Sequence, residues 1–359
     1  MWSAPRGKRP ILRAKHQTPN TKHGPLVIVL GIDTSCDDTS LAVLKDRREI
    51  LSNVVSSQVP LHRLFGGVVP EIASRKHVEL VDVVYREAME QAGLSLSDVD
   101  VVAVTQGPGL IGSVLVGLCF AKGLSQASQK PLIGVNHIEA HALSIFLDQE
   151  IDFPFLALIV SGGHSVILLF TEPARFSMIG TTRDDAVGEA FDKIAKYLGL
   201  GYPGGKVIED GAKSGRGDSV SFPRPMIDEK NYDFSFSGLK TAFINYVKKN
   251  GISDSNRSDI LASFQEAACD ILAFKTLKAA KDLGIRRIVL GGGVASNGRL
   301  REVFFERAET EGISVHVPPS KLCTDNGAMV AVTGHFYASL NRFSPLDIKG
   351  YSRMSWKAC

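Results

Sequence analysis

Residues 26–44 read LVIVLGIDTSCDDTSLAVL, and this stretch decides the fold. An apolar run, 26–30, passes through a polar turn, 33–38, into a second apolar run, 40–44. Two apolar runs joined by a short turn of polar residues are typical of a β-hairpin. We therefore predict a hairpin whose turn is acidic and rich in hydroxyl groups.

A helix and a strand–loop–helix unit follow the hairpin. Apolar residues recur at helical spacing through residues 74–92, and Gly93 is a typical helix end. Residues 99–104 predict a strand, which leads through the glycines of 107–109 into a helix over 113–126. Strands that alternate with helices in this way indicate an α/β protein.

The same plan recurs in the second half of the chain. The repeat consists of a strand at 155–160, a polar turn at 161–164, a strand at 165–170, a strand at 287–290, glycines at 291–293 and a helix at 297–311. The second copy is longer because roughly residues 175–255 are inserted. We predict two related lobes that face each other across a cleft, where two polar turns would clamp a phosphate through their amides.

The domain organisation follows from this repeat. We assign residues 1–25 to a basic, disordered tail, 26–135 together with 320–359 to the first lobe, and 136–319 to the second lobe with a helical insertion. The tail carries six basic and no acidic residues, so the net charge of +3 leaves −3 for the rest. A nucleic-acid-binding arm, a mitochondrial transit peptide and an extension without function all stay open for the tail.

The composition excludes several classes of protein. With 359 residues, 22% charged and 44% hydrophobic, the chain has the length and apolar content of two soluble domains and is neither disordered nor fibrous. No run of about 18 apolar residues without a charge occurs, so we expect no membrane span. The five cysteines include no Cys-x-x-Cys pair, which argues against a disulfide framework or a zinc ribbon and favours a reducing compartment.

The glycine loop at 107–112 fits the pattern G-x-G-x-x-G after a strand and before a helix. A dinucleotide site would also need an acidic residue about 20 positions further on. Residues 125–136 contain none, so tight packing of the strand against the helix is the favoured interpretation. No P-loop pattern occurs in the chain.

Residues 137–141 read HIEAH and carry the sharpest chemical signal. Histidines four positions apart lie on one helix face with Cβ atoms about 5–6 Å apart, so His137 and His141 can bind one metal ion. The zincin motif H-E-x-x-H places its glutamate base directly after the first histidine. Glu139 stands one position further, about 100° round the helix, so a peptidase would lack its base. Two surface histidines without a ligand are the alternative interpretation.

A third metal ligand would come from another part of the chain. Asp325 is a candidate, and an apolar helix predicted at 328–340 follows it. An equally good interpretation makes Thr324 or Asp325 the N-cap of that helix. The sequence alone leaves both open.

Other segments indicate a bound ligand or a loop. Glycines at 291–293 end a strand and precede Asn297 at a helix start, where backbone amides favour a phosphate or a purine. Residues 201–205 predict a turn, and 234–241 predict an aromatic loop that leads into a helix. Asp192, on a predicted helix, would by itself be a solvated charge.

Together these motifs resemble the TsaD family, the tRNA adenosine threonylcarbamoyltransferases formerly described as O-sialoglycoprotein endopeptidases. The resemblance covers about residues 28–350 and rests on GIDTSCDDT at 31–39, HIEAH at 137–141, VSGGHS at 160–165, FDKIAKYLGL at 191–200, FSFSGLKTA at 234–242, GGGVASN at 291–297 and CTDNGAMVA at 323–331. Residues 66–71, GGVVPE, resemble bacterial members. The resemblance implies the actin-like ATPase fold, and transfer of a threonylcarbamoyl group from threonylcarbamoyl-AMP to N6 of the adenosine at position 37 of tRNAs that read codons beginning with A.

The resemblance also implies roles residue by residue. It implies metal ligands at His137, His141 and Asp325, and substrate-binding residues at Ile159, Val160, Ser161, Gly162, Gly163, Asp192, Gly205 and Asn297. Two positions depart from the family pattern. Lys206 replaces a proline, and Glu209 stands where many members have a ligand-contacting aspartate, which makes Glu209 a weaker candidate. No general base is identified, so proximity and metal-assisted polarisation are expected to supply the acceleration.

The same resemblance implies cofactors and partners. We expect one divalent metal ion per subunit, with Fe2+ ahead of zinc. The expected partners are a tRNA, threonylcarbamoyl-AMP, a paralogous actin-like protein of the TsaB type and a small P-loop ATPase of the TsaE type, without a membrane. The expected location is the cytoplasm, or the mitochondrion if the tail is a transit peptide. The alternative functions are a metallopeptidase, an ATPase or kinase of the actin-like fold, and a scaffold without activity.

Overall fold

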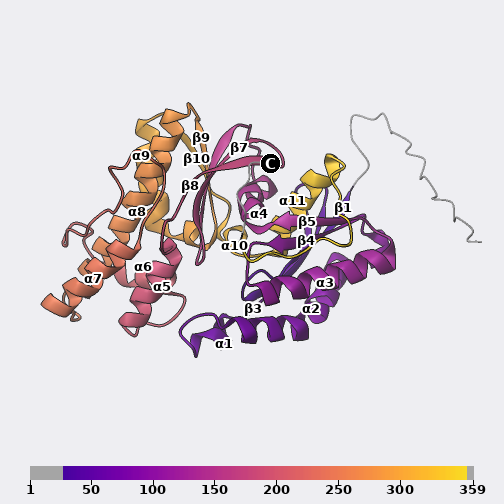
Figure 1. Ribbon diagram of the computed structural model, residues 1–359, viewed down its shortest axis with the longest axis horizontal. Coiled ribbons are helices and arrows are strands. Elements are labelled where there is room, and N and C mark those ends of the chain that lie inside the picture. Colours follow the sequence, from indigo (N-terminus) through magenta and orange to yellow (C-terminus); the bar gives the residue numbers. More distant parts are fainter. Residues whose placement is uncertain (1–26, 354–359) are drawn as a thin grey trace, which may run out of the picture.

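The computed structural model of the chain describes residues 27–353 and contains two five-stranded sheets (Figure 1). The first sheet consists of β1 (Ile28–Asp33), β2 (Asp38–Lys45), β3 (Glu49–Ser57), β4 (Val101–Gly107) and β5 (Leu132–Asn136). The second sheet consists of β6 (Phe155–Val160), β7 (Ser165–Glu172), β8 (Arg175–Thr181), β9 (Arg287–Gly291) and β10 (Ser314–His316). The predicted tail at 1–25 lies outside the described residues.

The two sheets have the same topology. The strand order is β3-β2-β1-β4-β5 in the first and β8-β7-β6-β9-β10 in the second. In each sheet the first three strands pair antiparallel, the fourth pairs parallel to the first, and the fifth pairs parallel to the fourth. This repeat confirms the predicted α/β fold with two duplicated lobes.

Helices cover both sheets (Figure 1). On the first sheet, α2 (Pro70–Ala92) and α3 (Ile111–Ser128) pack on one face, and α11 (Gly327–Ser339) packs on the other. Short α1 (Val59–Arg63) connects β3 to α2, and α4 (His137–Leu143) lies beside α11. The remaining helices are α5 (Val187–Tyr197), α6 (Gly204–Ala212), α7 (Ser237–Asn250), α8 (Arg257–Asp282), α9 (Gly298–Thr310) and α10 (Ser320–Cys323).

Three apolar cores hold these layers together. Because successive strand residues point to opposite faces, Leu30 and Ile32 of β1 pack with α2 and α3, whereas Val29 packs with α11. Strand β6 divides in the same way: Leu158 joins the core of the second lobe, and Ile159 joins the central core. The central core contains residues of both sheets, α4 and α11, and therefore joins the two lobes.

Most predicted elements are confirmed, and three strands were missed. The helix predicted over 74–92 is α2, and Gly93 ends it in the left-handed conformation with φ 65°. Strands β3, β8 and β10 were not predicted. The insertion predicted over 175–255 is wrong at its start, because 175–181 form β8, whose mostly half-buried residues contain no apolar run. The described cysteines form no disulfide, as predicted.

Helix α3 is the one described helix that is long and apolar enough, by length and composition alone, to cross a membrane. Its mean hydropathy is 1.2, and 33% of its residues are buried. Val114 and Leu118 lie in that buried part, and the helix packs against α2 and β4 as a layer of the first lobe. Ile111, Leu115 and Cys119 remain exposed on its other side.

Candidate metal centre

Helix α4 places two histidines where the two sheets meet. The Asn136 side chain accepts hydrogen bonds from the amides of Ile138 and Glu139, which fixes the helix start directly before His137. The rings of His137 and His141 then lie edge to face with centroids 4.7 Å apart. Both side chains are buried. They are therefore not the surface histidines of the alternative interpretation.

Asp325 reaches the histidine pair from the far end of the chain. Its Oδ1 atom lies 3.1 Å from Nε2 of His141 and 3.6 Å from Nε2 of His137. The interpretation of Thr324 or Asp325 as the helix cap is wrong, because the side chain of Asn326 accepts the capping hydrogen bond of α11. The Asp325 carboxylate is therefore available to the imidazoles.

The geometry of these three side chains fits one metal ion. One ligand atom of each lies within 4.8 Å of the others. Atoms around an ion in a tetrahedral arrangement at about 2.1 Å lie about 3.4 Å apart, close to the separations of 3.1 and 3.6 Å. Nδ1 of His137 and both ring nitrogens of His141 are buried without a hydrogen-bond partner. The 3.1 Å contact of His141 is thus no aligned hydrogen bond, and a cation would give these orphaned nitrogens a partner.

The charges at this centre also favour a cation. Burial lowers the pKa of His137, but the carboxylates of Asp325 and Asp33 outweigh it and raise the pKa to about 9. Burial raises the pKa of Asp325, yet the neighbouring histidines hold that pKa well below its usual range. A proton on His137 therefore supplies the positive charge that a metal ion would bring, and metal binding would release this proton.

Glu139, the middle residue of the HIEAH segment, points to α11. Its buried carboxyl accepts a hydrogen bond from the hydroxyl of Tyr337 at 3.0 Å. Burial raises the pKa of Glu139 to about 8, so the group carries a proton at neutral pH. A protonated carboxyl engaged with a helix cannot act as the water-activating base of a zincin.

Three residues beside the centre were not among the candidates from the sequence. Oδ1 of Asp33, at the end of β1, lies 3.5 Å from Nδ1 of His137. Burial and then the charge of Asp325 raise the pKa of Asp38 to about 7, and burial and the two histidines lower the pKa of His164 to about 4. Asp33 and Asp38 flank the first hairpin turn, and His164 belongs to the second. The polar turns were the signal in the sequence that could have found all three.

A buried histidine fixes the turn of the first hairpin. His77 of α2 contacts the Thr39 hydroxyl through Nδ1 at 2.8 Å and the Cys36 carbonyl through Nε2 at 3.0 Å. Nε2 must donate to the carbonyl, and the side-chain NH2 of Gln58, which can only donate, lies 3.5 Å from Nδ1, so Nδ1 is an acceptor and the ring is neutral. Burial lowers the pKa of His77, in agreement. The Gln58 amide donates to the Asp37 carbonyl at 3.0 Å, so the turn is held at two points.

The candidate substrate-binding residues all lie on the second lobe. Ile159 and Val160 are buried at the end of β6, and Ser161, Gly162 and Gly163 form the turn that follows. A Cβ atom at Gly162 or Gly163 would meet nothing within 4 Å, so this turn faces open space. A Cβ at Gly292 would lie 2.3 Å from the Val160 carbonyl oxygen, so the triple-glycine loop packs against the same strand end.

Asp192 and Gly205 lie at the junction of α5 and α6. The Asp192 carboxylate accepts a hydrogen bond from the Gly204 amide at 2.6 Å. Burial raises the pKa of Asp192 to about 6, so this group is not the solvated charge that the sequence alone suggested. A Cβ at Gly205 would contact only the Phe191 ring, at 3.7 Å. The start of α6 is therefore accessible to a ligand.

Asn297 and Glu209 both bond the start of α9. Asn297 accepts from the Leu300 amide at 2.9 Å and donates to the Gln265 side chain at 2.9 Å. Glu209 accepts from the Gly298 amide at 2.7 Å. Both ends of the Asn297 amide are thus engaged within the protein, which the sequence did not indicate.

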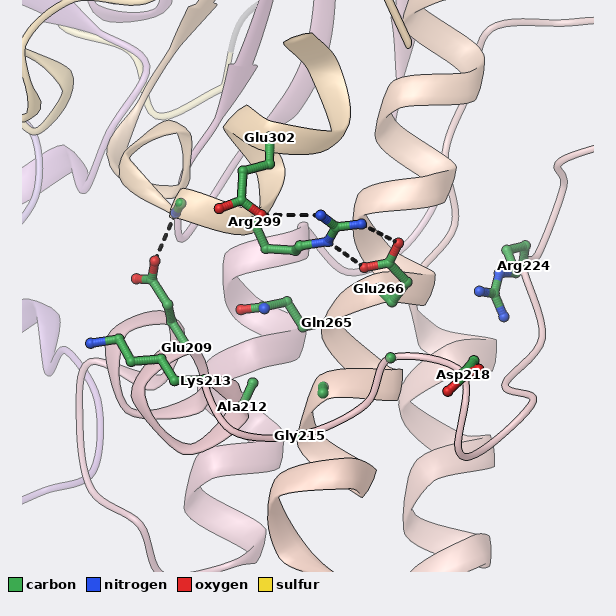
Figure 2. A pocket seen from close by; sticks show the side chains of 13 residues that line it. Glu209, Ala212, Lys213, Gly215, Asp218, Arg224, Gln265, Glu266, Arg299 and Glu302 are labelled. Atoms are coloured by element: carbon green, nitrogen blue, oxygen red, sulfur yellow. Dashed lines mark hydrogen bonds and ion pairs between the residues drawn. The ribbon is translucent and has the colours of Figure 1, made fainter. Parts of the chain in front are cut away.

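A cavity of about 700 Å³ adjoins this helix start (Figure 2). Its walls come from α6, α8, α9 and the loop after α6. Figure 2 shows Arg299 paired with Glu266 on one side and Glu209 bonded to the backbone of α9 on the other. Gln265, the partner of Asn297, also lines the cavity. Glu209 therefore lines this cavity, and Asn297 is linked to it through Gln265.

Solved structures with the same architecture define the class of protein. HypF from T. kodakarensis superposes with a TM-score of 0.62 over 88% of this chain and 48% of that chain, at 16% identity. Component A of the (R)-2-hydroxyglutaryl-CoA dehydratase of Acidaminococcus fermentans gives a TM-score of 0.52 over 87% of this chain and 99% of that chain, at 18% identity. These structures have the actin-like ATPase fold, and the chain shares it.

Sequence relatives narrow the class to a family. The model of the TsaD family, described as tRNA N6-adenosine threonylcarbamoyltransferase, matches residues 49–332. Curated relatives of that name from Geotalea uraniireducens and Syntrophus aciditrophicus are each 51% identical, over 90% and 91% of this chain and 94% and 97% of theirs. The chain therefore belongs to the TsaD family.

Family membership confirms the predicted class of enzyme. Members are transferases that modify an adenosine of tRNA, and the matched range contains every candidate site residue. None of the relatives described above favours the metallopeptidase or the kinase alternative. The engaged, protonated carboxyl of Glu139 argues independently against the peptidase.

Proposed function

We propose that this chain transfers the threonylcarbamoyl group of threonylcarbamoyl-AMP to N6 of the adenosine at position 37 of tRNAs that read codons beginning with A. In this reaction the amine nitrogen bonds to the carbamoyl carbon, AMP leaves from that carbon, and the amine loses one proton. The main support for this proposal is that His137, His141 and Asp325 lie together in a chain of this family. No side chain is assigned as the base.

His137, His141 and Asp325 would hold the metal ion, and we favour Fe2+ because two imidazoles and one carboxylate are a set that Fe2+ commonly accepts. When bound, such an ion supplies a Lewis acid for a carbonyl or phosphate oxygen. The chain itself keeps the ligands in place. Asn136 caps the helix of the histidines and Asn326 caps the helix behind Asp325, so the ligands need little reorganisation on binding.

The second lobe would hold the adenylate. The open turn at 161–163 offers backbone amides to a phosphate. The cavity beside α9, at about 700 Å³, is within the usual range for a small-molecule site and would take the nucleoside. We assign Asp192 and Gly205 to the path between them, and Asn297 and Glu209 to the support of the α9 start.

Positioning would supply most of the rate acceleration. An exocyclic adenine amine is a weak nucleophile, so it must be held against the carbamoyl carbon while the carbonyl is polarised. A metal centre fixed between the lobes and a donor site on the second lobe can meet both needs.

A transfer assay tests this function. The full chain receives labelled threonylcarbamoyl-AMP and an anticodon stem-loop with adenosine at position 37, with any required partner proteins present in every sample. We expect label on the adenosine, none on a stem-loop with guanosine at that position, and none with His137→Ala. Cleavage of a peptide with added zinc, or phosphate release from ATP alone without label on the RNA, would contradict the proposal.

We further propose that the chain works in the cytoplasm with a paralogous actin-like partner and a small P-loop ATPase. The apolar face of the first lobe supports the partner. Gly112 packs against Ser74, so α2 and α3 run side by side. Val78 is 65% exposed one turn further along α2, and Leu115 is 44% exposed one turn further along α3. Exposed apolar side chains on two adjacent helices favour a partner that covers them. Leu115→Glu should abolish co-purification of the partner, and unchanged co-purification would contradict this docking face.

A further inference from the structure

The segment between β3 and α2 crosses from the first lobe to the second. Arg63 Nε, at the end of α1, donates to the carbonyl of Tyr202 at 3.2 Å. In the opposite direction, Lys196 Nζ of α5 donates to the carbonyl of Phe65 at 3.4 Å. Figure 1 shows α1 below α5 at this edge of the molecule. One cation from each lobe therefore lies where the lobes meet.

These two cations keep their charge. Arg63 and Lys196 are exposed, and among the described residues neither forms an ion pair; both bond backbone carbonyls instead. Two exposed lysines of α5 and α6 are neutralised, since Lys193 and Lys206 each lie within 2.9 Å of a carboxylate. The edge between the lobes thus carries two cations that form no ion pair with a described residue.

Two exposed aromatic residues lie close in sequence to the two cations. Phe65 is 49% exposed and Tyr197 is 41% exposed. Tyr202 lies next to them, with its side chain half-buried. We call Arg63, Phe65, Lys196, Tyr197 and Tyr202 the rim patch. Exposed rings interleaved with free cations are a combination typical of single-stranded nucleic acid sites.

Tyr202 connects the rim patch to the metal centre. Burial and then the charges of Asp37 and Asp192 raise the pKa of its phenol well above the usual range, so the phenol lies beside the acidic turn of the first hairpin. Asp37 in turn lies near Asp325, whose charge adds to burial in raising the pKa of Asp37. Tyr202 therefore places the rim patch beside the turn that leads to the candidate ligands.

We propose that the rim patch binds the anticodon loop of the tRNA, with Arg63 and Lys196 on backbone phosphates and the aromatic rings stacked on unpaired bases. The inference rests on the proposed function. Cations at the rim attract the RNA backbone. Tyr202 joins the rim patch to the turn that leads to the candidate metal centre, which the target base has to reach. Free cations beside exposed rings favour RNA over a protein partner.

Steady-state transfer to an anticodon stem-loop tests the rim patch. We expect Arg63→Ala with Lys196→Ala to raise KM for the stem-loop about tenfold or more while kcat stays within about twofold. The slope of log affinity against log salt should become less steep by about 1.4, because each phosphate contact on single strands contributes about 0.7. Phe65→Ala should raise KM about tenfold through lost stacking. Arg63→Lys with Lys196→Arg should restore the salt slope.

Matched controls remove the same groups elsewhere. Lys249→Ala takes an exposed lysine from the last turn of α7, and Phe305→Ala takes a phenylalanine that is 49% exposed, as Phe65 is. Neither control should change KM for the stem-loop. Binding of a threonylcarbamoyl-AMP analogue should be equal in all variants, which shows that the second lobe and the donor site are intact.

Two results would overturn the inference. An unchanged KM and salt slope in the double variant, with wild-type transfer intact, would remove the rim patch from RNA binding and leave the proposed function standing. A loss that excess partner protein repairs would make the patch a protein-docking surface instead. Absence of transfer by the wild-type chain would contradict both the proposed function and this inference.

Discussion

The two sheets share one topology, but the turns of their hairpins carry different chemical groups. The turn of the first hairpin carries Asp37 and Asp38 and is held by His77 and Gln58. The turn of the second hairpin, 161–164, carries two glycines that face open space. A duplicated fold therefore supplies two similar scaffolds, of which one presents carboxylates near the metal ligands and the other leaves its backbone accessible to an anion.

The candidate metal ligands come from equivalent points of the two repeats. His137 and His141 follow β5, the fifth strand of the first sheet. Asp325 comes shortly after β10, the fifth strand of the second. The helices that carry these ends, α4 and α11, pack against each other between the sheets. The duplication thus brings the two halves of one centre together, which neither lobe contains alone.

Removal of one candidate metal ligand should have the largest effect on metal content and on activity, because the two repeats share this centre. His141→Ala should lower bound metal and transfer activity by more than about 100-fold, since loss of even an outer partner of a ligand costs about 10–100-fold. Metal content by mass spectrometry and transfer to the stem-loop check this. His316→Ala, a histidine on β10 outside the centre, should leave both unchanged. Full metal content in His141→Ala would contradict the shared centre.

A substitution in the second lobe should weaken binding of the donor without changing the metal content. Asn297→Ala removes the α9 cap and the bond to Gln265, and should weaken a threonylcarbamoyl-AMP analogue by about 1–3 kcal/mol. Metal content should not change. Titration calorimetry measures the affinity. Asn297→Ser keeps a capping oxygen, so affinity restored by serine would show that the cap alone matters; equal affinities of all three proteins would remove Asn297 from the donor site.

A fall in pH should lower the stability of the first lobe, because His77 is buried in its neutral form. Its pKa is lowered in the folded chain, whereas an unfolded histidine titrates near 6.5. The stability that the neutral ring contributes is present above about pH 6.5 and is lost as the pH falls toward the folded pKa. Between about pH 7.5 and 5.5, the wild type should lose more Tm than His77→Gln, by a few degrees. Calorimetry checks this, and equal losses would refute the neutral anchor.

Deletion of residues 1–24 should have the smallest effect. No candidate site residue lies there. The truncated chain should transfer threonylcarbamoyl to the stem-loop at nearly the wild-type rate, measured in low salt. A large loss in low salt that disappears at high salt, where both proteins bind RNA weakly, would instead identify the basic segment as an RNA-binding arm.

The sequence predicted the parts of the fold that have strong local signals. The apolar runs of β1, β2, β6 and β7 and the glycine after α2 were sufficient for those elements. Strands β3, β8 and β10 were missed because they lie at the edges of the sheets, and partly exposed edge strands have no apolar run. Their existence depends on pairing, which local sequence does not contain.

The candidate site was predictable where spacing along one helix fixes geometry. His137 and His141 are brought together by the helix period alone. Asp325 could only be proposed, because its approach depends on how α11 packs on α4. The bond of Asn297 to Gln265 and the contact of Arg63 with Tyr202 join distant segments, so no local pattern indicated them. Such long-range contacts follow from the packing of the lobes.

The position of α11 has a consequence for folding during synthesis on the ribosome. This last helix covers the first sheet, and its Gly327 amide bonds the Ser40 hydroxyl 287 positions earlier. Domains usually fold as they emerge, from the N-terminus onward. Here one apolar face of the first sheet stays uncovered until almost the whole chain has been translated. The histidine pair likewise meets Asp325 only when most of the chain has been made, so a metal ion held by all three side chains would bind late in synthesis.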